Sequence, residues 1–321
     1  MRNRFDKGII FAIIPILIII LLAAVIFLPK IISDKSIRNL VSKPTPTAVP
    51  TAIPTPTPTP IPTPIVTPIP LITASPKPEV PIITGPPGSG YSYVTVHTEK
   101  GDFSAQILLV DLNSAHMITD TANDSDCANN CPVDNVADFV NKNGGFAGVN
   151  GTYLCPGEPA YPECAGKTNS FDFPVWNTRL GHWINGGNLG WNSRSIFYTD
   201  GSGAHYNQNA NGFGGSLTAG VVNYPGILDN GNVQIDDNQS GLSDKQRGVN
   251  SKTGIGLIDP KHVIVVIASA ANMQQFAYIF KALGAKSALN LDNGGSTALY
   301  YNGHYLAGPG RNIPNAIIFA H

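Results

Sequence analysis

A run of residues between Ala288 and Tyr300 combines the groups that are best suited to chemistry in this sequence. Apolar residues alternate there with Asn290 and Asp292, which predicts a short buried strand that delivers polar groups at its end. The Asn and Gly residues that follow tolerate positive φ, so successive backbone N–H groups can face one concave site. This combination indicates a polar, anionic or sugar-like ligand. Besides Asp292, the candidate ligand-binding residues of the run are Asn290, Asn293, Gly294, Gly295, Ser296 and Thr297.

The same run has a simpler interpretation as a hairpin turn, because Asp-Gly and Asn-Gly pairs are common in turns. However, residues 290–296 (Asn-Leu-Asp-Asn-Gly-Gly-Ser) resemble the Asn-Leu-Asp-Gly-Gly-Gly-Ser signature of the phosphodiester glycosidase family. Asn293 replaces the first glycine of that signature, and Asn is the next best residue at positive φ. The family includes an enzyme that removes N-acetylglucosamine from a phosphodiester. The resemblance therefore implies a glycosidase that acts on a sugar-1-phosphodiester.

Two other stretches carry the same resemblance. Residues 150–153 (Asn-Gly-Thr-Tyr) follow a predicted strand, where the family shows Asn-Gly-Gly-Tyr-Phe or close variants. Near the end of the chain the family shows Arg, then Pro-Asn, then an apolar strand, and residues 311–319 keep this order. Taken alone, the first stretch could be a β-turn and the arginine an exposed loop residue. The site residues that these stretches imply are Asn150, Gly151, Tyr153, Arg311 and Asn315.

The resemblance implies catalytic roles for Asp292, Asn150 and Arg311. Asp292 would act as the nucleophile or as the base for a water molecule, and the guanidinium of Arg311 matches the geometry of a phosphate. Lys252 stands where the family usually has an arginine; it keeps the charge but lacks the bidentate fork. We expect Lys252 to bind the substrate together with the backbone amides of residues 294 and 295. No cofactor and no metal site are implied. No motif identifies a second catalytic carboxylate, for which the candidates are Asp200, Asp229 and Glu163.

Two other functions fit the same residues. The first is a non-catalytic surface module that binds wall or capsule polysaccharide through the asparagines, the aromatic residues and Arg311. Catalysis requires the carboxylate of Asp292, whereas sugar binding should survive its replacement by Asn. The second is a metal-dependent phosphodiesterase that uses Asp292 with other carboxylates, but the sequence has no convincing acidic cluster.

Composition argues against a nucleic-acid partner. Charged residues make up 13% of the 321-residue chain, and the formal net charge is −1. No run rich in Lys and Arg is present, so the basic patch that would attract phosphate backbones is missing.

The first 29 residues predict a membrane anchor. A short tail, residues 1–8, precedes an almost unbroken apolar run over residues 9–29. A hydrocarbon core of roughly 30 Å requires about 20 such residues in a helix. Basic residues flank both ends, so the positive-inside rule gives no orientation. A cleaved signal peptide is the alternative, but the run is long for one and lacks a clear Ala-x-Ala-like site.

Residues 30–90 are predicted to form an extended linker. Pro-Thr and Pro-Ile units repeat between Pro44 and Pro87, and proline both restricts φ and removes backbone donors. A polyproline II conformation over this stretch reaches on the order of 100 Å at about 3.1 Å per residue. Its threonines could carry O-glycans. Together with the anchor, this segment predicts a domain held outside the cytoplasm at the cell surface.

Residues 91–321 are predicted to form one α+β domain, a mixed β-sheet with few helices, as the resemblance also implies. Pro260 and Lys261 separate two of the strands in a predicted hairpin. Gly284 is expected to end the last helix in the C′ position. The predicted strands are 91–96, 103–112 (around a turn at 100–102), 146–149, 195–200, 252–259, 262–269, 288–291 and the apolar C-terminal run; the predicted helices are 133–141 and 272–283.

Four cysteines bracket the Asn150 stretch. Four cysteines allow three pairings. We favour Cys127–Cys131 and Cys155–Cys164, because local pairs suit the surrounding loops rich in Asn, Gly and Pro. Zinc is the alternative, but the spacing is not that of a zinc finger. Disulfides would stiffen the loops around Asn150.

Overall fold

A computed structural model describes residues 85–157, 162–190, 194–211 and 213–321. The predicted anchor and the first 55 residues of the predicted linker (30–84) lie outside the described residues. Among the described helices, none is long and apolar enough to cross a membrane. Residues 85–89, placed in the linker from the sequence, contact the domain: the backbone N–H of Asp111 donates to Ser89 Oγ at 2.9 Å.

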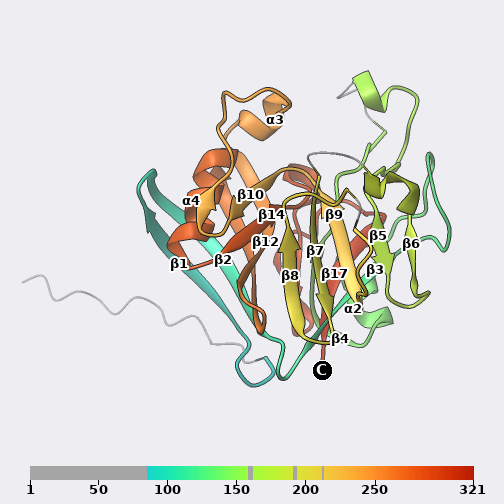
Figure 1. Ribbon diagram of the computed structural model, residues 1–321, viewed down its shortest axis with the longest axis horizontal. Coiled ribbons are helices and arrows are strands. Elements are labelled where there is room, and N and C mark those ends of the chain that lie inside the picture. Colours follow the sequence, from blue (N-terminus) through green and yellow to red (C-terminus); the bar gives the residue numbers. More distant parts are fainter. Residues whose placement is uncertain (1–84, 158–161, 191–193, 212) are drawn as a thin grey trace, which may run out of the picture. The chain divides into compact units, whose positions relative to one another are not determined.

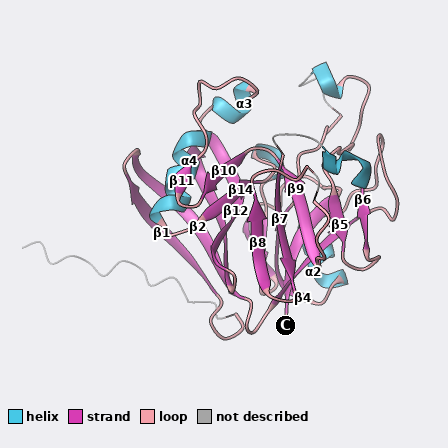
Figure 2. Ribbon diagram, in the orientation of Figure 1, coloured by secondary structure: helices cyan, strands magenta, loops and turns pink. Residues whose placement is uncertain are grey.

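Strands dominate the described part of the chain (Figures 1 and 2). They form three sheets, and every described strand pair is antiparallel, where we had expected a mixed sheet. The first sheet has the order β1 (Gly90–Thr98), β2 (Gly101–Asp111), β13 (His262–Ala271), β12 (Asn250–Asp259), β14 (Ser287–Asn290), β10 (Gly226–Asp229) and β11 (Asn232–Val233). The second has the order β16 (His304–Ala307), β15 (Leu299–Tyr301), β4 (Gly145–Asn150), β17 (Asn315–Ala320) and β3 (His116–Thr121). The third has the order β6 (His182–Ile184), β5 (Val175–Asn177), β9 (Ala219–Asn223), β7 (Ser195–Asp200) and β8 (Gly203–Asn207).

The largest apolar core is shared by the three sheets. Strand β13 shows how the first sheet contributes to it, because successive side chains of a strand point to opposite faces. Val263 and Val265 join the core shared by the sheets, whereas Ile264 and Val266 join a second core beneath helix α4 (Met273–Ala282). Both faces of the strand are therefore buried, which explains its nearly continuous apolar sequence.

The described helices are few and short. Helix α4 lies beside the first sheet (Figure 1) and begins at a capping box in which Asn272 and Gln275 bond each other's backbone. Gly284 follows it at φ +83°, as expected of a C′ glycine. Helix α2 (Val136–Lys142) packs on the second sheet. The remaining helical segments are α3 (Asp244–Arg247) and the 3₁₀ turns η1 (Pro162–Cys164), η2 (Gly186–Gly190) and η3 (Gly294–Ser296).

Most expected elements are confirmed, with boundaries shifted by a few residues. The turn expected at residues 100–102 lies slightly earlier in the chain. Gly101 and Asp102 already belong to β2, and Thr98 pairs with Gly101. Gly101 takes φ +118°, which allows a tight two-residue turn between the strands. The expected cysteine pairs are confirmed as Cys127–Cys131 and Cys155–Cys164.

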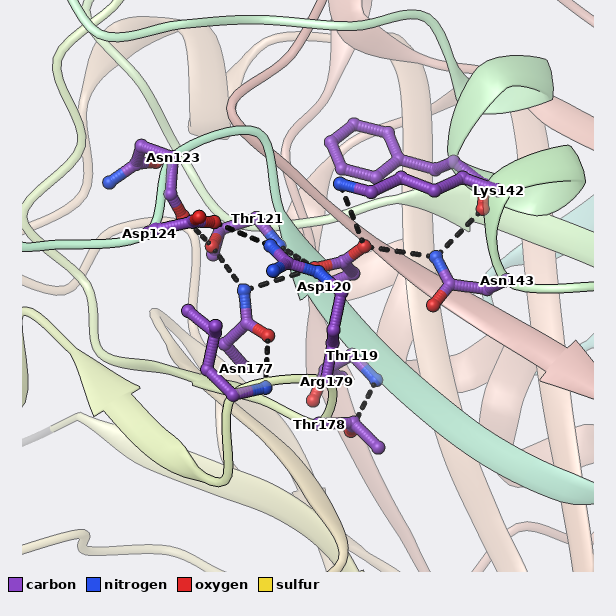
Figure 3. A network of polar contacts seen from close by, with 12 residues as sticks. Thr119, Asp120, Thr121, Asn123, Asp124, Lys142, Asn143, Asn177, Thr178 and Arg179 are labelled. Atoms are coloured by element: carbon purple, nitrogen blue, oxygen red, sulfur yellow. Dashed lines mark hydrogen bonds and ion pairs between the residues drawn. The ribbon is translucent and has the colours of Figure 1, made fainter.

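A buried carboxylate connects the second and third sheets (Figure 3). Asp120 of β3 is fully buried, and it lies 3.5 Å from Lys142 Nζ of α2 and 3.7 Å from Arg179 Nε, which follows β5. The side-chain amides of Asn143 and Asn177 each donate to it at 3.0 Å. A buried charge is tolerated only when it is paired and hydrogen-bonded. This network therefore stabilises the packing of β3 against α2 and against the end of β5.

We expect Asp120→Ala to lower the free energy of unfolding by about 2–4 kcal/mol, since the mutation leaves buried donors without an acceptor. Asp124→Ala is the matched control: Asp124 pairs with the same Arg179, but its side chain is 69% exposed. Its replacement should cost much less stability, because solvent screens an exposed ion pair. Urea denaturation of both variants measures the difference, and equal losses would contradict the stabilising role of the Asp120 network.

Candidate active site

The run that contains Asp292 leaves the end of β14 and enters the turn η3. Two backbone hydrogen bonds fix this path: Leu291 N–H donates to Thr253 O of β12 at 2.9 Å, and Asp292 N–H donates to Gly151 O at 2.9 Å. The Asp292 loop, residues 291–298, is thus attached to the first sheet on one side and to the residues after β4 on the other.

Asn150 holds the two ends of this loop together. Its side-chain nitrogen donates to Asp292 O at 2.8 Å, and its side-chain oxygen accepts from Ala298 N–H at 3.1 Å. The residue is fully buried. The structure therefore gives Asn150 a positioning contact with the loop; its catalytic role stays a prediction.

Asn315 performs a similar task on the other side of β4. Its side-chain oxygen accepts from Thr152 N–H at 2.9 Å, and its side-chain nitrogen donates to Thr152 Oγ1 at 3.0 Å. Gly151 lies so close that an added Cβ would be 1.9 Å from Asn315 Oδ1. Only glycine fits at this position, and the chain can therefore pass directly beneath the Asp292 loop.

The Tyr153 hydroxyl lies at the centre of an amide cluster. It is within hydrogen-bonding distance of the side-chain nitrogens of Asn290 (2.6 Å), Asn293 (3.1 Å) and Gln246 (3.0 Å). Asn290 itself is fully buried. This cluster orders the loop from beneath, so it explains why three residues predicted to bind substrate lie together.

Asn293 does not take the positive φ that we expected of it. Its φ is −123°, and Gly294 is instead the left-handed residue at +61°. The side chain of Asn293 explains the difference: its oxygen accepts from Thr253 N–H at 2.8 Å and its nitrogen reaches Tyr153, which together hold an extended backbone.

Asp292 is partly buried where the chain passes from β14 into η3. Burial raises its pKa to about 6, whereas hydrogen bonds from the Ser296 hydroxyl and the Asn293 N–H and the charges of Arg311 and Lys245 act in the opposite direction. The Asn293 N–H lies 2.8 Å from Oδ1. A pKa near 6 lets the group act as a base near neutral pH.

Arg311 brings a cation to the same loop. Its backbone N–H donates to Gly295 O at 2.8 Å, and its guanidinium lies against Gly295, where an added Cβ would be 2.5 Å from Nη2. The buried Nε has no hydrogen-bond partner among the described residues. The guanidinium is therefore positioned by the glycine and retains donors for an anion.

Lys252 lies on the opposite face of β12 from the loop. Its ammonium group is buried and donates to Gly248 O at 2.9 Å and Asn250 Oδ1 at 2.6 Å. Burial lowers its pKa to about 8. The structure thus uses Lys252 to hold the segment that follows α3, and it does not bring the ammonium group to Arg311.

The sequence model of the phosphodiester glycosidases matches residues 167–320. The resemblance to the phosphodiester glycosidase family is confirmed. The match includes the Asp292 loop and Arg311, while the Asn150 stretch lies before it. A comparison with curated proteins finds no match.

Solved structures share the fold. The catalytic domain of zebrafish N-acetylglucosamine-1-phosphodiester alpha-N-acetylglucosaminidase, auto-inhibited by its pro-peptide, matches with a TM-score of 0.55 and 17% identity, over 73% of this chain and 83% of that one. A hypothetical protein from Synechocystis matches with a TM-score of 0.53 and 14% identity, over 72% of this chain. The match spans 62% of the length of the Synechocystis chain. At these identities, the likeness shows a shared fold.

Sequence reasoning missed two residues that support the loop, one by direct contact and one through Tyr153. Thr253 Oγ1 lies 3.1 Å from Thr297 Oγ1, and Gln246 contacts Tyr153. The signal for Thr253 was present: because strand residues alternate between faces, Lys252 and Thr253 cannot both face the loop.

Two of the three candidates for a second carboxylate, Asp200 and Asp229, have partners away from Asp292. Asp200 ends β7, where hydrogen bonds from Ser202 and His205 hold its pKa well below the usual range. Asp229 accepts from Ser287 Oγ at 3.2 Å. The side chain of Glu163 lies outside the described residues. The charged groups that act on the Asp292 carboxyl are two cations, Arg311 and Lys245.

We expect Asp292→Asn to stabilise the fold at pH 7 by about 1–3 kcal/mol. The folded pKa of about 6 lies above the unfolded value, so the stability due to this group is complete below about pH 4 and is lost as the pH rises through 6. Asn cannot lose it. Urea denaturation at pH 7 and pH 4 should show a gain only at pH 7.

Asp200→Asn is the control of opposite sign, because hydrogen bonds lower the pKa of that carboxyl group. It should lose stability at pH 7. A loss at pH 7 for Asp292→Asn as well would mean that Arg311 and Ser296 outweigh burial.

Proposed function

We propose that the domain hydrolyses a sugar-1-phosphodiester, with Asp292 as the base and Arg311 as the phosphate ligand. The observation that carries the proposal is a partly buried carboxyl group, with a pKa of about 6, on the Asp292 loop, and a guanidinium with free donors that packs against the same loop. The match to the phosphodiester glycosidase family over residues 167–320 supports it.

The proposed reaction requires only one carboxylate. A water molecule attacks the anomeric carbon and gives its proton to Asp292, while the bond from that carbon to the phosphate oxygen breaks. The electron pair of this bond remains on the departing phosphate monoester, so no acid has to protonate the leaving group. Arg311 and the backbone amides of residues 294 and 295 stabilise the negative charge.

The sugar that we propose is N-acetylglucosamine. The zebrafish protein of the same fold is named for removing this sugar from a 1-phosphodiester. We also propose that the substrate belongs to a cell-surface or exopolysaccharide glycan. The apolar run at residues 9–29 and the Pro/Thr-rich stretch after it support a domain that is anchored in the membrane and lies outside the cytoplasm.

The test is release of N-acetylglucosamine from a 1-phosphodiester by the full chain. We expect Asp292→Asn to lower kcat by roughly 10²–10⁴-fold and Arg311→Ala by roughly 10²–10³-fold. Because the active form of Asp292 is the carboxylate, the rate of the unmodified protein should rise with pH to a plateau above about pH 6.

Lys286→Ala is the matched control, since it removes one exposed positive charge just before β14, at the end of the strand opposite the Asp292 loop, and should leave the rate unchanged. Release that survives in Asp292→Asn would contradict the assignment of the base. No release, with polysaccharide bound equally by the unmodified protein and Asp292→Asn, would instead favour a binding module.

A further inference from the structure

A cavity of about 430 Å³ with both polar and apolar lining adjoins the Asp292 loop. Two residues of the loop, Gly294 and Thr297, form part of its wall, so whatever occupies the cavity touches the loop directly. The other lining residues come from β1, β2, β12, β13 and the end of β16: Tyr93, Ser104, Gln106, Ser251, Ile267, Ser269, Ala307 and Gly308.

The register of the first sheet explains how polar side chains come to line part of this cavity. Tyr93, Gln106, Ile267 and Thr253 pair in one row across β1, β2, β13 and β12. Two residues further along β2 the same face carries Leu108, which belongs to the core shared by the sheets. The face thus gains polar side chains at the row that reaches the Asp292 loop, although Ile267 of that row still belongs to the apolar core.

The lining groups suit a neutral sugar ring. No charged residue lines the cavity, whereas serine and threonine hydroxyls and one amide provide both donors and acceptors. The hydroxyls of Ser104 and Ser269 form no hydrogen bond within the described ranges. Tyr93 is 53% exposed and presents an apolar ring face with a polar tip.

We propose that this cavity is a subsite for an uncharged sugar ring, which stacks on Tyr93 and bonds the surrounding hydroxyls. The inference rests on the proposed function, because it places the phosphate at Arg311 and the neutral glycan next to it. Thr297 connects the cavity to the Asp292 loop. It belongs to the loop and lines the cavity, and its hydroxyl group contacts that of Thr253 in β12.

The experiment is an NMR titration of the full chain with uncharged methyl glycosides of N-acetylglucosamine, glucose, galactose and mannose. We expect at least one of them to bind, Tyr93→Ala to weaken its binding at least tenfold, and Tyr93→Phe to retain it. Val94→Ala is the matched control, because Val94 is exposed on the opposite face of the same strand. It should bind as the unmodified protein does.

The subsite is overturned if no neutral glycoside binds, or if Tyr93→Ala binds as tightly as the unmodified protein. The titration does not depend on catalysis and can be repeated with Asp292→Asn, which should bind the glycoside equally well. Binding that depends on Tyr93 without release of sugar from the phosphodiester would therefore contradict the proposed reaction and leave the subsite standing. Release with an unchanged KM in Tyr93→Ala would contradict the subsite alone.

Discussion

The candidate site depends on buried side-chain amides that form hydrogen bonds with backbone groups where the first and second sheets meet. Asn150 bonds both ends of the Asp292 loop, and Asn315 bonds the chain that passes beneath it. These groups are fully or almost fully buried, so any hydrogen bond that was lost would leave an unsatisfied polar group. The loop therefore has one well-determined path, even though it contains two adjacent glycines that would otherwise be flexible.

This rigidity has a consequence for the charges. Because the hydrogen bonds fix the path of the loop, the fold keeps the Asp292 carboxyl group partly buried, at a cost in stability. Gly295 has no side chain, and that space is occupied by the guanidinium of Arg311. A base with a raised pKa and a cation with free donors are thus fixed at one place, as a reaction that expels a phosphate requires.

Residue patterns predicted several strands, the helices α2 and α4 and the disulfides, because these depend on local alternation, capping and loop chemistry, but they did not predict short strands such as β3, β9 and β15. The site motifs were found by resemblance, and the fold brings the Asp292, Asn150 and Asn315 stretches together. Contacts between distant segments could not be predicted. Asp120 meets a partner 57 residues away, and no local pattern indicates it. The contacts of Lys252 with Gly248 and Asn250 could not be predicted either, because its charge suggested a ligand; its role in substrate binding stays a prediction.

The most direct test of this account is a crystal structure of Asp292→Asn with an uncleaved N-acetylglucosamine-1-phosphodiester. The account predicts phosphate oxygens within hydrogen-bonding distance of the Arg311 guanidinium and the anomeric carbon facing residue 292. A diester bound elsewhere on the domain, with Arg311 making no contact to it, would contradict the claim that this loop is the catalytic site.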